Sequence, residues 1–431
     1  MDNKLSLGAS CKVITPKVGG QLYGYRPDVM SSSVNDDLTV TAFYFKQGET
    51  QALMISATVC LIDSKLSDDI LSEISSRYGI PKQNCLLHAT HTHSGPNVSG
   101  TFGWGDIDRE YCDSIFVPRI LDAVKEAIER VQPVKMAVSY GESLVGINRR
   151  ELRTDNRIAL GQNPWGPFNP QMTVISFVTP DKKPVANIIH YGAHGTAAGT
   201  NHEISRDWSG VMIDAVTAEF GGITAFFNGP EGDVGPRLTN GKTVGDIGYV
   251  MRLGAVAAQD AVKIRKNAKC YGDAKLEVSE QILNVPLDPR IPLEKAKVDY
   301  EPIKDKTVNA IGARANYLRT VIQSYEDGYT DLKTLPVSQT VIRIGDVAFV
   351  GFAYELFSEI GMRIAQASPI PYTLSLSNTN GSEGYFVTED QVCRGGYEID
   401  MFKTKYIQPY SDNADWHVIT QTLEHLNKLD K

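Results

Sequence analysis

Short apolar runs rich in β-branched and aromatic residues alternate along the chain with longer amphipathic segments. The apolar runs predict strands over residues 40–45, 52–57, 85–91, 172–178, 185–190, 225–228, 339–343 and 347–352. The amphipathic segments predict helices over residues 67–78, 109–131, 207–220, 245–266, 356–367 and 414–428. This alternation predicts an α/β fold of layered sheets flanked by helices. A tight turn at residues 46–49 favours mixed rather than purely parallel sheets.

The segment over about residues 291–328 has a different character, because it is charged, prone to helix and poor in turn signals. This pattern predicts a long helix or a helical hairpin that lies on the outside as a solvated excursion. No internal repeat, low-complexity tract or Pro/Ser-rich linker divides the 431 residues. We therefore expect residues 1–431 to form a single domain.

The balance of charge argues against several classes of partner. The formal net charge is −8 and the acidic and basic residues are interspersed, so no basic stripe is available for nucleic acid or an anionic membrane. No apolar stretch is long enough to span a bilayer, and the N-terminus lacks the pattern of a signal peptide. We expect a cytoplasmic protein, or a secreted one if a leader was removed, that acts on a small molecule. The oligomeric state stays open.

Six of the eight histidines stand in two short clusters. The run HATHTHSGP holds His88, His91 and His93, and the run IIHYGAHGTAAGTNH holds His190, His194 and His202. Neutral imidazole is the commonest protein ligand for zinc and similar metals, so the clusters predict two walls of one metal site. For any single histidine the alternative is a surface position or a hydrogen-bonded place in the core.

The candidate ligands stand where predicted strands end. His91 and His93 alternate at the end of one strand, so both point to the side where open α/β sheets bind ligands. His194 follows a second strand, among small residues that let the backbone come close to a metal. Glu355 lies between a third strand and a helix, where it is either a further ligand or a first-turn glutamate favoured by the helix dipole. Asp207, near a helix start, is a cap or an acceptor behind a ligand.

Four motifs in this order resemble the neutral (non-lysosomal) ceramidase family. They are THTHSGP at residues 90–96, AHGT at 193–196, GDVGP at 232–236 and GYFVTEDQVCRGGYE at 384–398. The resemblance extends from about residue 15 to residue 398 and implies the fold of a neutral ceramidase catalytic domain. THTHSGP is specific by itself, whereas the other motifs are persuasive as an ordered set.

The resemblance also implies a set of site residues. In that family one zinc ion is held by two histidines, a glutamate and a tyrosine, which implies one Zn²⁺ per chain held by His91, His194, Glu355 and Tyr385. The residues implied to line the pocket and contact the reacting carbonyl or its oxyanion are His93, Arg149 and Tyr397. Arg150 follows Arg149, so the register there is open by one residue. Structural or supporting roles remain for His88, His190 and His202.

The chain departs from the family at Gly235, where ceramidases have a serine that resembles a nucleophile. After Tyr397 only one short stretch and a helix remain, so we expect no C-terminal immunoglobulin-like domain of the kind that accompanies the catalytic domain in ceramidases. The sequence therefore predicts a zinc-dependent hydrolase that cleaves an amide bond of an N-acyl or other small amide substrate, or less readily an ester. Zinc-activated water rather than a serine attacks the carbonyl. Asp233 or Glu231 is the candidate for moving protons, and a turn residue is the alternative role of Asp233.

Two other functions stay open at this point. The missing serine at position 235 also fits a non-catalytic relative that binds a ligand through an intact pocket. A two-metal amidohydrolase is the second alternative, in which HTH is part of a larger metal-binding pattern, although Ser94 and Gly95 follow in place of further ligands. The metal content and a screen for turnover separate the three functions.

Overall fold

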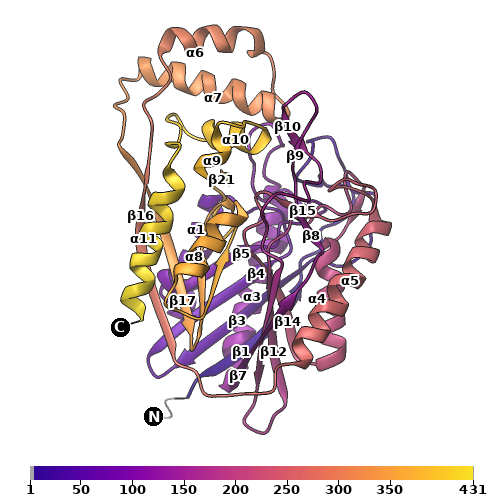
Figure 1. Ribbon diagram of the computed structural model, residues 1–431. Coiled ribbons are helices and arrows are strands. Elements are labelled where there is room, and N and C mark those ends of the chain that lie inside the picture. Colours follow the sequence, from indigo (N-terminus) through magenta and orange to yellow (C-terminus); the bar gives the residue numbers. More distant parts are fainter. Residues whose placement is uncertain (1–3, 431) are drawn as a thin grey trace.

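The computed structural model describes residues 4–430, and its first sheet has five strands (Figure 1). Their order is β5 (Cys85–Ala89), β4 (Thr50–Ala57), β3 (Thr39–Gln47), β1 (Ser6–Val13) and β6 (Gln132–Pro133). β4 and β5 are parallel and are joined by helix α1 (Ser64–Tyr78), whereas the other pairs are antiparallel. Apolar residues of α1 and α3 (Val117–Glu129) pack on this sheet.

The second and third sheets have four strands each. The second runs in the order β14 (Ile223–Asn228), β12 (Pro184–Tyr191), β11 (Gln171–Val178) and β7 (Lys135–Glu142), with helices α4 (Asp207–Phe220) and α5 (Ile247–Lys266) beside it. The third runs in the order β16 (Leu276–Pro286), β17 (Thr334–Ile344), β18 (Val347–Gly351) and β20 (Tyr372–Leu376), with helices α8 (Ser358–Ala367) and α11 (Ala414–Leu429) beside it. Both sheets are mixed, as expected, because β12–β14 and β18–β20 are parallel pairs.

One topological unit occurs once in each sheet, although the sequence shows no repeat. The unit is an antiparallel hairpin, then a helix, then a strand parallel to the second hairpin strand: β3–β4–α1–β5, β11–β12–α4–β14 and β17–β18–α8–β20. Large apolar side chains from all three sheets share one core, including Phe43, Phe45, Phe177, Phe227 and Phe349. The carboxyl ends of the parallel pairs therefore point into one region.

Short ladders and single turns shape the loops at that end of the molecule. The two-stranded ladders pair β2 (Ser33–Val34) with β13 (Glu203–Ile204), β8 (Gly146–Asn148) with β15 (Val234–Pro236), β9 (Arg150–Leu152) with β10 (Ile158–Leu160), and β19 (Glu355–Leu356) with β21 (Tyr385–Phe386). The short helices nearby are α9 (Glu389–Val392) and α10 (Tyr397–Lys403). Within residues 4–430, no helix combines the length and apolar character needed to cross a bilayer.

Two predicted helices differ from the structure in instructive ways. The helix predicted over 109–131 is divided into α2 (Arg109–Tyr111), a π turn at Cys112–Phe116 and α3, because Pro118 lacks the N–H that a continuous α-helix requires. The segment predicted over about 291–328 is a helical hairpin of α6 (Leu293–Tyr300) and α7 (Asn309–Glu326), as expected. It is more than a solvated excursion, because the first residues of α7 line the main cavity.

Two histidines outside the metal group are held neutral in the core. His88 receives the Asn228 N–H on Nε2 (2.8 Å) and lies 2.9 Å through Nδ1 from the Ser377 carbonyl. His190 Nε2 lies 2.9 Å from the Ser375 carbonyl. Burial lowers the pKa of His88 to about 3 and that of His190 to about 4. Both residues therefore have the structural role that the sequence left to them.

The pKa of His190 gives a testable pH dependence. Between pH 4 and 6.5 the unfolded chain binds a proton at His190 that the folded chain does not, so stability decreases as the pH falls through this window, by about 1.4 kcal/mol per pH unit. We expect His190→Gln, which keeps a donor for Ser375, to remove that slope from the free energy of urea unfolding. His202→Gln, at an exposed histidine, is the control. An unchanged slope in His190→Gln would contradict the assignment.

Candidate metal centre

The two histidine clusters lie side by side because their backbones are paired. Thr92 forms a parallel bridge with Gly195, and the His93 N–H donates to the Gly195 carbonyl at 3.1 Å. A Cβ atom at position 195 would lie 2.7 Å from the His91 carbonyl oxygen, so only glycine allows the two segments to approach this closely. The pairing turns His91 and His194 toward each other, with ring centroids 4.5 Å apart.

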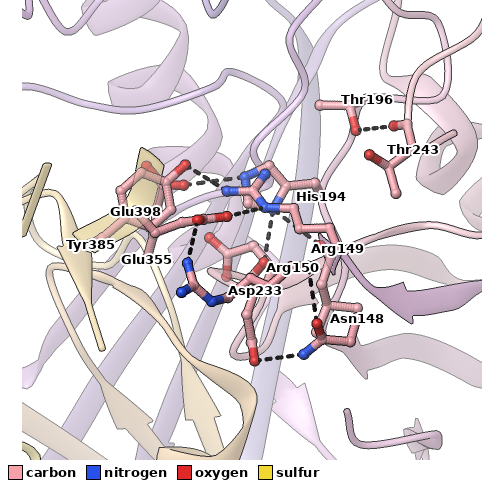
Figure 2. Close-up of polar contacts among 12 residues, drawn as sticks. Asn148, Arg149, Arg150, His194, Thr196, Asp233, Thr243, Glu355, Tyr385 and Glu398 are labelled. Atoms are coloured by element: carbon pink, nitrogen blue, oxygen red, sulfur yellow. Dashed lines mark hydrogen bonds and ion pairs between the residues drawn. The ribbon is translucent and has the colours of Figure 1, made fainter. Parts of the chain in front are cut away.

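Glu355, which lies in β19 just after strand β18 of the third sheet, completes this group. Its Oε2 atom lies 3.4 Å from His91 Nε2 and 3.2 Å from His194 Nε2, and all three residues are at least 95% buried. Figure 2 shows Glu355 beside His194. One ligand atom from each residue lies within 4.8 Å of the others. The structure therefore brings together three of the four residues that the sequence assigned to the metal.

Backbone carbonyls fix which nitrogen of each imidazole faces the group. His91 Nδ1 lies 3.0 Å from the Cys60 carbonyl, and His194 Nδ1 lies 2.8 Å from the Glu231 carbonyl and 3.1 Å from that of Val234. A carbonyl accepts only, so each Nδ1 carries a proton and each Nε2 is the nitrogen turned toward Glu355. Burial would lower the pKa of His91, yet Cys60 and Glu355 hold it well above its usual value. Burial lowers the pKa of His194 to about 3, which keeps that ring neutral.

The polar atoms of this group are ones that a metal ion satisfies. Among the described residues, neither His194 Nε2 nor Glu355 Oε2 has a hydrogen-bond partner, although both are buried. Burial would raise the pKa of Glu355, yet the charge of His91 and the contact with His194 hold it well below its usual value, so the carboxylate is charged. Buried lone pairs and a buried charge without donors are costly, whereas two imidazoles and a carboxylate suit a divalent metal. The residues present therefore fit a metal ion.

A second possible group shares His91 with the first. Cys60, His91 and His93 also place their ligand atoms within 4.8 Å of one another. Cys60 Sγ faces the Nδ1 side of His91 at 3.7 Å, and that nitrogen is already used by the Cys60 carbonyl. The group of His91, His194 and Glu355 is thus the better metal site.

Tyr385 lies beside Glu355 because strands β19 and β21 pair in register, with Glu355 opposite Tyr385. The Tyr385 hydroxyl accepts a hydrogen bond of 2.9 Å from Arg149 Nη2, and the side chain is buried. Burial raises the pKa of this phenol, and the Arg149 charge opposes that shift. Tyr385, which only the resemblance suggested, is therefore adjacent to the metal group.

Of the two adjacent arginines, Arg149 is the one that lines the main cavity, which favours the register with Arg149. Glu398 holds both guanidinium groups: its Oε1 accepts from Arg149 Nε at 3.0 Å and its Oε2 from Arg150 Nη1 at 2.7 Å. Arg150 turns away to the Gly395 carbonyl. Sequence reasoning missed Glu398, although it lies in the GYFVTEDQVCRGGYE motif.

A cavity of about 710 Å³ opens beside the metal group, lined by residues that include His93, Arg149, Tyr385 and Tyr397. A smaller pocket of about 60 Å³ shares His93, Tyr385 and Tyr397 with it and reaches His91 and Glu355. The predicted pocket residues therefore lie between the open cavity and the metal ligands. Asn309 and Ala310, at the start of α7, close another part of the cavity wall.

The two candidates for moving protons lie in different places. Asp233 accepts hydrogen bonds from the N–H (2.7 Å) and hydroxyl (3.1 Å) of Ser358 and from Asn148 Nδ2 (3.1 Å), and it is not among the residues that line the cavity. Burial raises its pKa to about 7. Glu231 is fully buried; its Oε1 accepts from Asn378 Nδ2 at 2.6 Å, and burial raises its pKa to about 8. Asp233 thus connects two parts of the chain: the segment that contains Asn148 and Arg149, and the start of α8.

Three supporting residues were missed by sequence reasoning or were given a different role. Cys60 and Asn378 follow strands β4 and β20, the same position in the unit as the ligands, and both contact His91. Asp207 binds the N–H groups of Ala197 and Ala198, so it fastens the loop after His194 as well as opening α4. The signal for Cys60 and Asn378 was their place at the ends of apolar strands.

A comparison with known proteins identifies the family of this chain. A family model for neutral/alkaline non-lysosomal ceramidase, N-terminal, matches residues 6–252. The chain belongs to the neutral/alkaline non-lysosomal ceramidase family. The family match confirms the resemblance that the four motifs indicated. Members of this ceramidase family are hydrolases.

Curated relatives agree with this membership, and a solved structure shows the same fold. Neutral ceramidase A of Dictyostelium discoideum is 28% identical over 273 residues, which cover 57% of this chain and 37% of that protein. A neutral ceramidase of Mycobacterium tuberculosis is 25% identical, over 54% of this chain and 40% of that protein. The crystal structure of neutral ceramidase from Pseudomonas aeruginosa matches with a TM-score of 0.76 and 18% identity, over 99% of this chain and 74% of that one. The expected ceramidase-like α/β fold is confirmed, and the sequence matches span less than half the length of these two relatives.

Proposed function

We propose that this protein is a zinc-dependent hydrolase that cleaves the amide bond of an N-acyl substrate. The observation that carries the proposal is the buried group in which the Nε2 atoms of two imidazoles converge on the Glu355 carboxylate. Membership of a family of hydrolases supports the same reaction class. The proposal extends from that class to the metal, the bond and the roles of individual residues.

Four residues of this chain hold the metal in the proposal: His91, His194, Glu355 and Tyr385. Zinc, when bound there, supplies a Lewis acid and an activated water with a pKa of about 7. The carbonyls of Cys60, Glu231 and Val234 orient the two imidazoles from behind, so both rings are in place before a metal arrives.

Arg149, His93 and Tyr397 act on the substrate carbonyl. Arg149 is held by Glu398 and Tyr385, so its charge is fixed beside the cavity and stabilises the negative charge that develops on the carbonyl oxygen. His93 is neutral, since burial and the neighbouring His91 and His194 lower its pKa, and its Nδ1 has no partner among the described residues. Tyr397 packs edge-on to Tyr385 and supplies a hydroxyl to the same wall.

Glu231 is the better of the two candidates for moving a proton. It lies next to the metal ligands through Asn378, whereas the Asp233 carboxylate is engaged by three donors away from the cavity. We therefore assign Asp233 to positioning, since it holds Asn148 and the N–H of Ser358 at the start of α8.

The cavity defines the substrate class that we propose. Its volume of about 710 Å³ is within the range of sites for drug-sized molecules, and its wall mixes aromatic residues such as Trp104 and Tyr25 with the charged group of Arg149. The relatives are named for ceramide hydrolysis, and ceramide is itself an N-acyl amide. A small amide with an apolar acyl arm and a polar amine-derived half fits both features.

The metal and the reaction are tested together. We expect the purified protein to contain one equivalent of zinc, to lose amide hydrolysis when a chelator removes it, and to recover when zinc is returned. Metal analysis by mass spectrometry is combined with a panel of short-chain ceramide, N-acyl amino acids and acyl esters. Two equivalents of metal would favour a two-metal amidohydrolase. Binding without turnover of any panel member would favour a non-catalytic ligand-binding protein.

A further inference from the structure

Gly235 has no side chain, and the space that a side chain would need is filled by Thr243. Gly235 lies in strand β15, opposite Ile147 of β8. A Cβ atom added at position 235 would lie 2.6 Å from Thr243 Cβ, 2.7 Å from its Cγ2 and 3.3 Å from its Oγ1. No side chain at 235 fits unless Thr243 moves. The glycine at position 235 and the position of the Thr243 side chain therefore depend on each other.

The loop that carries Thr243 is fixed in place. Thr196 donates its hydroxyl proton to the Thr243 carbonyl at 2.9 Å (Figure 2). Gln162 Nε2 donates to the carbonyls of Leu238 and Lys242, both at 2.8 Å. These hydrogen bonds hold the backbone at residues 238, 242 and 243. The position of Thr243 is therefore fixed by contacts with the rest of the fold.

The Thr243 hydroxyl is available to a ligand. Thr243 is 6% exposed, and it lines the same cavity as His93, Arg149 and Tyr385. Among the described residues its Oγ1 has no recorded hydrogen bond, whereas the neighbouring hydroxyl of Thr196 is used by the Thr243 carbonyl. A hydroxyl at a buried cavity wall that makes no hydrogen bond to the protein can donate one to a bound molecule.

We propose that Thr243 is a substrate-contacting residue whose hydroxyl donates a hydrogen bond to the polar half of the N-acyl substrate. The Thr243 side chain occupies the space that a side chain at position 235 would need. No covalent bond forms in this step. The inference rests on the proposed function for the identity of the substrate. The chain thus places a cavity hydroxyl through a loop residue rather than through strand β15.

The kinetic test uses substitutions that separate the hydroxyl from the shape. Thr243→Val keeps the shape and removes the hydroxyl, and we expect kcat/KM for the best substrate of the panel to fall about tenfold. Thr243→Ser keeps the hydroxyl, and we expect it to retain activity within about threefold of the native protein. Thr239→Val, on the exposed part of the same loop, is the matched control and keeps native activity. Equal activities of the Val and Ser variants would overturn the proposal. A total loss in Thr243→Val with retention in Thr243→Ser would also overturn it, in favour of a nucleophilic threonine.

Two further measurements do not depend on turnover. If the native protein hydrolyses no panel member, the proposed function fails, and the affinity for short-chain ceramide then tests Thr243 alone: about tenfold weaker binding in Thr243→Val but not Thr243→Ser supports the contact, and equal affinities overturn it. The packing is tested by thermal unfolding. Gly235→Ser lowers Tm by a few degrees, and Thr243→Ala in the same chain restores most of that loss. Independent, additive effects would show that Thr243 does not fill the space at 235.

Discussion

His194→Ala and Glu355→Gln variants bind no zinc and lose amide hydrolysis by about a thousandfold or more, because the metal supplies several kcal/mol of transition-state stabilisation. Each substitution removes one of the two lone-pair donors that converge at 3.2 Å. Zinc content by mass spectrometry and kcat/KM for the best N-acyl substrate check this result. Circular dichroism confirms that each variant still unfolds in one cooperative transition.

The control for these variants is an exposed histidine of the same cluster. His202 lies on the surface with its Nδ1 2.7 Å from the Met30 carbonyl, so His202→Ala is expected to keep one equivalent of zinc and native activity. Full zinc occupancy in a His91→Ala/His194→Ala double variant would disprove the assignment of the metal group.

Replacing Arg149 by methionine is expected to lower kcat/KM by about a hundredfold to a thousandfold, the usual effect of removing a donor that stabilises a developing oxyanion. Arg150→Met is an unusually close control. Both arginines are buried, both bind Glu398, and they are adjacent in sequence, yet only Arg149 lines the cavity. Steady-state kinetics on both variants measure the difference.

The two arginine variants also separate catalysis from stability. Each leaves Glu398 with one arginine instead of two, so both are expected to destabilise the fold by a similar amount, about 1–3 kcal/mol in urea unfolding. Arg150→Met should lose only a few-fold in activity. Equal losses of activity would mean that Arg149 acts only by holding Glu398 in the fold.

The apolar pattern alone predicted most of the elements that place the metal group. The strands predicted over 85–91, 185–190 and 347–352 correspond to β5, β12 and β18, because buried strands are continuous apolar runs. The first ends earlier than predicted, at Ala89, and His91 follows it with a left-handed φ of 70°. Edge strands such as β7 and β16 were missed, since their alternating exposure weakens the apolar signal. The helix predicted over 356–367 is α8, which begins at Ser358 because Leu356 pairs in β19 instead.

What the sequence could not predict are contacts made across large separations along the chain. Glu398 binds Arg149 from another part of the molecule, and Asn378 reaches both His91 and Glu231. Glu398 has no periodic or compositional signal of its own, and the place of Asn378 after a strand does not show which residues it contacts. The position of Thr243 against Gly235 is of the same kind, because a gap left by one glycine can be filled only by a side chain that the fold delivers.

Because the hairpin–helix–strand unit is repeated, the proposed metal would connect the three sheets. His91, His194 and Glu355 follow strands β5, β12 and β18, which belong to three different sheets. A ligand that binds only the docked arrangement stabilises it by RT ln(1 + [L]/Kd), which is about 4 kcal/mol at a thousand times Kd. Loosening any one sheet far from the cavity therefore weakens metal binding as well as the fold. Zinc affinity becomes a measure of how well the whole architecture is assembled.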